Sequence, residues 1–332
     1  MRLAASAAPP TLSTLHLQQQ QHHSSSTSPS FSSSFSSSTK MILSNPATPS
    51  GEGLLTTFVI DVGIQLATWA ISSPLKTEKF YDLSGSITYI ACFLNALLNR
   101  GDGAALSSLH PRQIIAVIFC LVWCSRLGLF LFRRVLREGK DHRFDDIKVA
   151  PFKFLFAFVA QIAWVWFTGL AVFIVAANPS ATQPTINALD VIGIIWWVVS
   201  FAIEAVADYQ KNTFKNANPT KFITTGLWAY SRHPNYFGEV MLWIGMFLLC
   251  ATGFVEPWQW VGVLSPIFVF FLLYFGSGVR LLEQSSDKRY GHLPEYQDYK
   301  ARTSIFVLWP PKEAGGSPLR VAVDGSDGPS PA

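Results

Sequence analysis

Polar and charged residues stand directly before a long apolar run. The stretch SRHPNYFGE, residues 231–239, leads into VMLWIGMFLLCATGF. Its chemically useful side chains are Arg232, His233, Asn235, Tyr236 and Glu239. Pro234 suits the first turn of a helix, and the free N–H groups at such a helix end attract phosphate or carboxylate groups. The stretch therefore predicts an anion-binding site at a helix start. Asn235, Tyr236 and Glu239 share one helix face by their spacing.

A second polar stripe precedes this stretch. In EAVADYQKNTFK, residues 204–215, Glu204, Asp208 and Lys211 follow each other at intervals of four and three. They therefore lie on one face of a helix. Lys211 and Lys215 are suited to pair with phosphate groups. The alternative is that these residues anchor a helix at a membrane surface or form internal ion pairs.

The third candidate region follows the last apolar run. Glu283 comes soon after that run, and Tyr290, Tyr296 and Tyr299 follow it at short intervals. One interpretation is a lid that covers a bound nucleotide and stacks on its base. The other is an aromatic belt at the membrane interface.

Arg126 lies about midway along another apolar run. A charge at such a position requires a partner or water, and we expect Glu239 or Glu204 to supply it. An ion pair between helices and a contact with a ligand are equally open.

The elements that must position these residues are membrane helices. The chain has 332 residues, of which 49% are hydrophobic and only 14% charged, against about 25% charged in soluble proteins. No basic helix or aromatic pattern typical of nucleic-acid binding is present. A span needs about 20 apolar residues, which predicts an all-α polytopic bundle of about seven helices. The predicted spans are 54–72, 83–99, 113–132, 152–177, 189–207, 236–255 and 259–282. The second span is the least apolar.

The basic residues predict the orientation of the bundle. Twenty Lys and Arg residues fall in one set of alternate loops and in the C-terminal region, and four fall on the opposite side. Because basic loops stay in the cytosol, we expect an outer or lumenal N-terminus and a cytosolic C-terminus. The SRHPNYFGE stretch then lies at the cytosolic face.

The two ends of the chain lack the composition of a folded core. Residues 1–50 are rich in Ser and Gln and contain no acidic residue, which predicts a disordered leader before a membrane domain at 51–311. This leader is either an organelle-targeting segment, an unstructured tail or an extension upstream of a start at Met41. Residues 312–332 are predicted to be a disordered tail. The four cysteines lie in apolar runs, which favours packing over disulfides or metal binding.

These segments together resemble the membrane steroid 5-alpha-reductase-like superfamily, in particular its uncharacterised branch with a steroid-reductase C-terminal-type domain. The resemblance covers roughly residues 80–311. The stretches that carry it are WCSRLGLFLFRR, GKDHRFD, ADYQKNTFK, GLWAYSRHPNYFGE, SGVRLLE and YGHLPEYQDYKARTSIFVLWPP.

The resemblance implies a membrane enzyme whose C-terminal helices enclose NADPH. The cofactor-binding residues it implies are Asp208, Lys211, Arg232, His233, Asn235, Tyr236, Glu239, Tyr290 and Tyr296. The implied reaction is hydride transfer to a carbon–carbon double bond of a steroid or other lipid. Members of known activity also use a Glu and a Tyr in their N-terminal helices. Asp61, Tyr81 and Tyr89 are available here, but the sequence does not select among them, so the catalytic residues stay unassigned.

Two other functions fit the same residues. Isoprenylcysteine carboxyl methyltransferases and phospholipid methyltransferases share an RHP followed by Tyr and bind S-adenosylmethionine, which lacks phosphates for Lys211 and Lys215. A non-catalytic lipid-binding protein on the same fold would bind no nucleotide. The resemblance places the protein in the endoplasmic reticulum, while the Ser-rich leader leaves a plastid or mitochondrial membrane open.

Overall fold

The computed structural model describes residues 51–100, 105–138, 144–276 and 278–313, and within these ranges it is helical and contains no β-strand. The predicted leader at 1–50, the second start at Met41 and nearly all of the predicted tail lie outside the described residues.

The first six of the described helices coincide with the first six predicted spans; the seventh span, 259–282, includes the next helix and the start of the one after it, and the last helix lies beyond the spans. Their bounds are α2 (Gly51–Ser72), α3 (Tyr81–Leu98), α4 (Pro111–Glu138), α5 (Pro151–Ala177), α6 (Ala188–Ala217), α7 (Pro234–Ala251), α8 (Leu264–Phe271), α9 (Val279–Tyr290) and α10 (Pro294–Arg302). Among the residues that the structure describes, six segments are long and apolar enough to cross a membrane, and the last of them runs from Pro257 to Tyr290. The prediction of a polytopic helical membrane bundle is confirmed, while the orientation of its termini stays a prediction.

Helix α3 corresponds to the second predicted span and is not among these six segments. It has 18 residues but is less apolar than the other six, because it carries polar side chains on the face toward α2. Gln65 of α2 donates a hydrogen bond to Thr88 of α3 at 2.9 Å, and Asn95 donates one to Thr57 at 2.8 Å. Helix α3 therefore packs by hydrogen bonds as well as by apolar contact.

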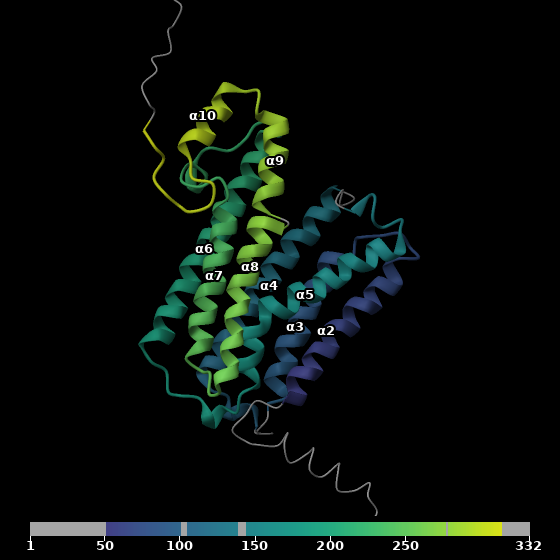
Figure 1. Cartoon of the computed structure of the whole chain (residues 1–332), viewed down its shortest axis with the longest axis vertical. Helices are drawn as coiled ribbons and strands as arrows, with labels where there is room; N and C mark the ends of the chain where they lie inside the picture. Colours follow the sequence, from purple (N-terminus) through teal and green to yellow (C-terminus); the bar gives the residue numbers. More distant parts are fainter. Residues whose placement is uncertain (1–50, 101–104, 139–143, 277, 314–332) are drawn as a thin grey trace, which may run out of the picture. The chain divides into compact units, whose positions relative to one another are not determined.

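Helices α6 and α7 run side by side (Figure 1) and make the closest contact of the bundle. A Cβ atom on Gly238 would lie 2.7 Å from the backbone nitrogen of Glu204, and one on Gly245 would lie 2.8 Å from that of Trp197. Small residues allow helix backbones to approach closely in a membrane bundle. This packing sets the polar residues of α6 directly beside those at the start of α7.

A buried ion pair holds the opposite end of these helices. The Nε of Arg112 at the start of α4 donates to Oδ1 of Asp190 in α6 at 2.7 Å, and Nη2 donates to Oδ2 at 2.9 Å. Neither side chain is exposed. Asp190 also accepts the backbone N–H of Asn187 and so caps α6. This ion pair holds the start of α4 against the start of α6. The start of α7 lies at the other end of the bundle, beside the end of α6.

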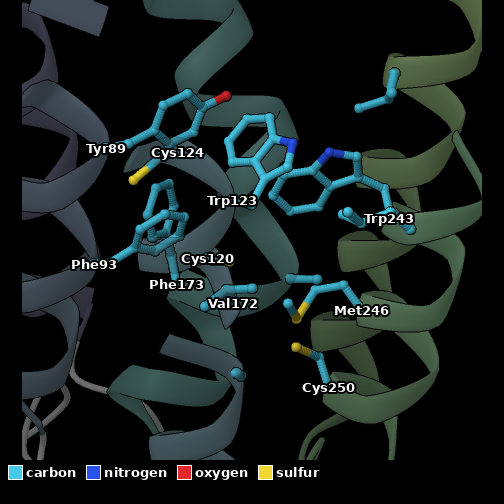
Figure 2. Close-up of a cluster of buried hydrophobic side chains, with 14 of the residues drawn as sticks. Tyr89, Phe93, Cys120, Trp123, Cys124, Val172, Phe173, Trp243, Met246 and Cys250 are labelled. Carbon is cyan, nitrogen blue, oxygen red and sulfur yellow. The ribbon is translucent and has the colours of Figure 1, made fainter. Parts of the chain in front are cut away.

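Aromatic side chains fill the centre of the bundle. Figure 2 shows the rings of Tyr89, Trp123 and Trp243 in a row across this core, with the two indole nitrogens close together. The Trp123 ring packs edge-on against both others, at centroid distances of 5.3 and 5.0 Å. All four cysteines are buried thiols.

We predict that Gly245→Ala destabilises the protein, because its new Cβ would meet a backbone that cannot move aside. Overpacking of this kind costs about 1–3 kcal/mol. Gly63→Ala in α2 is the matched control, since nothing lies within 4 Å of its Cβ position. Melting temperatures in detergent should fall for Gly245→Ala only. Equal melting temperatures for both variants would contradict the close contact of α6 and α7.

Candidate functional site

The C-terminal segment holds the residues before α7 in place. The Ser231 hydroxyl donates to the carbonyl of Phe306 at 2.7 Å, and the Arg232 N–H donates to the carbonyl of Ser304 at 2.8 Å. Helix α7 then begins at Pro234, as predicted. These contacts place Arg232 and His233 next to α9 and α10, which lie beyond the start of α7 in Figure 1.

A small cavity lies between the end of α6, the segment before α7 and helices α9 and α10. Its volume is about 100 Å³. The polar residues around it are Lys211, Lys215, Arg232, His233, Glu283 and Ser286, and its aromatic residues are Phe222, Trp228, Tyr290, Tyr296 and Tyr299. Five of the nine predicted cofactor residues therefore surround one cavity, although they come from four separate segments of the chain.

The carboxylate of Glu283 contacts three side chains at this cavity, those of Arg232, His233 and Lys300. Its Oε2 lies 2.9 Å from Nη2 of Arg232 and 3.6 Å from Nζ of Lys300, and its Oε1 lies 2.9 Å from Nε2 of His233. Arg232 also donates from Nη1 to the carbonyl of Lys300 at 2.8 Å. Most N–H groups of the Arg232 guanidinium therefore donate to acceptors within the protein. These hydrogen bonds hold α9 and α10 against the start of α7.

The two lysines of α6 differ in their partners. Nζ of Lys215 donates to the Tyr290 hydroxyl at 2.9 Å. The ammonium of Lys211 lies 5.0 Å over the ring of Trp228 and forms no hydrogen bond or ion pair with any residue that the structure describes. The Asp208 carboxylate attracts this ammonium without contacting it, and an ammonium removed from water without a hydrogen-bonded anion is unfavourable. Lys211 is therefore the group of the cavity that is best placed to receive a bound anion.

Tyrosines from α9 and α10 close the other side of the cavity around Phe222. The ring of Phe222 lies 5.1 Å from that of Tyr296 and 5.4 Å from that of Tyr290. The Tyr299 hydroxyl donates to the carbonyl of Trp228 at 2.7 Å. Aromatic pairs at these separations attract one another, so the tyrosines hold the C-terminal helices on the body of the protein.

Burial sets the protonation of the groups around the cavity. It lowers the pKa of His233, although the hydrogen bond to Glu283 acts in the opposite direction. His233 is therefore a neutral imidazole at neutral pH, and its Nδ1 is buried without a hydrogen-bond partner among the described residues. Burial raises the pKa of Tyr296 to about 12, so this phenol stays protonated.

The remaining predicted residues belong to a second group, the buried acidic cluster. Its members are Arg126, Glu204, Asp208, Asn235 and Glu239. Nη1 of Arg126 lies 3.0 Å from Asp208, and Nη2 of Arg126 contacts Glu204, as predicted for one of its two candidate partners. Asn235 donates to Asp208 at 3.0 Å. The indole N–H groups of Trp123 and Trp243 both donate to Glu239. The Glu239 side chain therefore faces the interior of the bundle.

The predicted site is thus divided between two neighbouring clusters. Lys211, Arg232 and His233 lie at the cavity with Tyr290 and Tyr296, and the deeper residues do not line it. Tyr236 lies between the clusters and stacks on the His233 ring at a centroid distance of 5.9 Å.

Glu283 was not among the predicted site residues. In the sequence, only its position just after the last apolar run distinguishes Glu283 from other carboxylates.

The three N-terminal candidates occupy different surroundings. The Tyr81 hydroxyl donates to the carbonyl of Ala157 at 3.0 Å, and that of Tyr89 donates to the carbonyl of Trp164 at 3.2 Å. The carboxylate of Asp61 is fully buried, and neither of its oxygens has a hydrogen-bond partner among the described residues.

Comparison with known proteins places the chain in a family. Residues 68–303 match a family described as a protein of unknown function, DUF1295. The chain belongs to this steroid 5-alpha-reductase-like family. The matched range of this DUF1295 protein includes both clusters of the site.

Two relatives of this DUF1295 protein are informative. An uncharacterized protein of Schizosaccharomyces pombe is 24% identical over 281 residues, which cover 75% of this chain and 78% of that protein. The Delta(14)-sterol reductase LBR of Gallus gallus is 26% identical over 183 residues, which cover 50% of this chain and 28% of LBR. No solved structure matches the chain.

We predict that Glu283→Gln destabilises the protein by about 1.5–3 kcal/mol, the usual range for hydrogen bonds to charged groups. Arg232 and His233 would both lose the same carboxylate. Asp298→Asn is the matched control on α10, because the ion pair of Asp298 with Arg302 is exposed and such pairs contribute little. Thermal unfolding should separate the two variants, and an unchanged Glu283→Gln protein would exclude a holding role for this carboxylate.

The lowered pKa of His233 predicts a pH dependence of stability. The unfolded chain binds the proton at a pKa of about 6.5, above the folded value, so the contribution of neutral His233 is present above that pH and is lost as the pH falls below it. His233→Gln should therefore lose less stability than the unchanged protein between about pH 7 and pH 5. Melting temperatures across this range test this, and parallel curves would contradict it.

Proposed function

We propose that this protein is a membrane-embedded reductase that uses NADPH to reduce a carbon–carbon double bond of a steroid or other lipid. The observation that carries the proposal is the unpaired ammonium of Lys211 in a cavity with Lys215 and Arg232. The family membership and the distant similarity to a sterol reductase favour the same reaction class.

The chemistry of the cavity suits the phosphates of a dinucleotide. Lys211 has no anionic partner in the described part of the chain, and Lys215 is held near it by the Tyr290 hydroxyl. The buried Nδ1 of His233 also lacks a partner there; because Nε2 of the neutral imidazole donates to Glu283, Nδ1 is an acceptor. Phosphate oxygens bound by two ammonium groups form strong charge-assisted hydrogen bonds. We therefore assign phosphate binding to Lys211 and Lys215.

The size of the cavity sets a condition on this proposal. A volume of about 100 Å³ accommodates one phosphate group, whereas small-molecule sites usually span about 300–1,000 Å³. A whole dinucleotide would therefore require α9 and α10 to move away from α6. The Glu283 ion pairs and the tyrosines around Phe222 are the contacts that such a movement would loosen.

The bound NADPH would supply a hydride. This chain would supply the anchoring of the phosphates by its lysines, the aromatic cover from α9 and α10, and a water-poor bundle next to the cavity. The substrate would come from the membrane, since the spans expose apolar side chains on their outer faces. The endoplasmic reticulum is the membrane that we propose, with a plastid or mitochondrial membrane as alternatives.

The cations of the cavity argue against S-adenosylmethionine, the cofactor of the alternative methyltransferase reading. That cofactor carries a positive sulfonium and no phosphate. Lys211 and Lys215 would repel the sulfonium, and the methionine carboxylate is the only anion that this cofactor offers to them. A non-catalytic lipid-binding protein would have no anionic ligand for Lys211, which forms no ion pair in the described part of the chain.

We predict that NADPH raises the melting temperature of the protein in detergent and that S-adenosylmethionine does not. A ligand that binds only the folded state stabilises it by about 2.7 kcal/mol at a concentration of 100 times its Kd. Stabilisation by S-adenosylmethionine alone would support the methyltransferase, and stabilisation by neither would support the non-catalytic protein.

Lys211→Gln should weaken NADPH binding about tenfold or more, because a hydrogen bond to a charged group contributes about 1.5–3 kcal/mol. Lys288→Gln removes the same charge from an exposed position of α9 that does not line the cavity and serves as the control. Equal NADPH affinity in both variants would contradict the role of Lys211.

A further inference from the structure

The buried acidic cluster is rich in carboxyl groups, which have no part in binding phosphate at the cavity. It contains the carboxyl groups of Glu204, Asp208 and Glu239 and one guanidinium, that of Arg126. No second cation is paired with these carboxyl groups in the described part of the chain. If all three were ionised, the cluster would carry a net charge of −2 inside a membrane bundle, which is costly.

The contacts show which carboxyl groups are satisfied. Asp208 is paired with Arg126 and also accepts from Asn235. Oε1 of Glu239 accepts from the indole N–H of Trp243 at 3.0 Å, and Oε2 accepts from that of Trp123 at 3.2 Å. Both oxygens of Glu239 are therefore acceptors, as expected of an ionised carboxylate.

Glu204 is in a different position. Its side chain is almost fully buried, and Arg126 contacts only its Oε1. Its Oε2 is buried and has no hydrogen-bond donor among the described residues. The Cβ position of Gly238, the residue before Glu239, lies 3.0 Å from Cβ of Glu204, and the carboxyl groups of Glu204 and Glu239 interact. Two carboxyl groups in such contact share a proton, because two adjacent like charges cannot both persist in a buried site.

No other titratable group around Glu204 and Glu239 in the described part of the chain neutralises the second of these two carboxyl groups. Helix α4 contributes Arg126, which is already shared with Asp208. Helix α3 contributes Tyr89, whose hydroxyl donates to the carbonyl of Trp164 rather than to either glutamate. Helices α6 and α7 contribute the carboxyl groups themselves, held together by the close backbone contact at Gly238.

We propose that Glu204 carries a proton and donates it as a hydrogen bond to the carboxylate of Glu239, so that the two residues form a one-proton store inside the bundle. We infer further that this store supplies the proton of the reduction. That second statement rests on the proposed function, whereas the presence of the proton does not.

The balance of the proposed reduction requires such a group. Saturating a carbon–carbon double bond forms two C–H bonds, one from the hydride of NADPH and one from a proton, and leaves NADP⁺. The proton would leave Glu204, and both glutamates would then be ionised beside Arg126 until a proton returned from water. The proton store lies near the cavity, because Tyr236 is one helical turn before Glu239 and stacks on His233, which lines the cavity.

Infrared difference spectroscopy of the purified protein in lipid nanodiscs tests the store directly. A protonated carboxyl group has its own C=O stretching band, which shifts in D₂O. The background should be Asp61→Asn, because the buried Asp61 can give a band of its own. In that background we expect one such band at neutral pH, lost in Glu204→Gln and in Glu239→Gln and retained in Asp208→Asn.

A band that survives both glutamate substitutions, or the absence of any band at neutral pH, would overturn the store. Glu239→Gln provides the test if Glu204→Gln does not fold. The use of the proton has a separate readout: with an enone steroid as probe substrate, Glu204→Gln should lower kcat and leave NADPH affinity unchanged. An unchanged kcat would overturn that use. A missing NADPH shift with the band present would contradict the proposed function alone.

Discussion

The carboxylate of Glu283 is the interaction on which the candidate site depends. It joins the start of α7 to α9 and α10 across 51 residues of sequence, through Arg232, and it binds His233 as well. Without this carboxylate, two donors at the base of the cavity would lack their anion and the C-terminal helices would lose their main polar attachment. Glu283 therefore occupies the guanidinium of Arg232, and Lys211 is the cation of the cavity that is left to bind another anion.

The contact of α6 with α7 connects the two clusters of the site. Gly238 lets the helix backbones meet at Glu204, so that the first turns of α7 present Tyr236 toward the cavity and Asn235 and Glu239 toward the acidic cluster. A larger residue at position 238 would separate the glutamates. The same close packing that stabilises a membrane bundle thus also brings a phosphate-binding region next to a buried acid pair.

Much of this arrangement follows from local patterns in the sequence. The start of α7 at Pro234, the helical spans and the need of Arg126 for a carboxylate were predictable, because proline position, apolar length and the cost of a lone charge act over short distances. Glu204 was one of two candidate partners for Arg126, and Asp208 was not expected as a further one. The role of Glu283 was not predictable, because its partners lie far away in sequence. The division of SRHPNYFGE between two clusters was also unpredictable, since helix spacing places residues on a face but does not say which neighbour that face meets.

Hydrogen exchange measured with and without NADPH tests whether this cavity binds the cofactor. We expect slower amide exchange on binding in two separate segments, the end of α6 around Lys211 and the α9–α10 region from Val279 to Arg302, because the dinucleotide would bridge them. Protection confined to other helices, or no protection at saturating NADPH, would contradict the assignment of this cavity as the cofactor site.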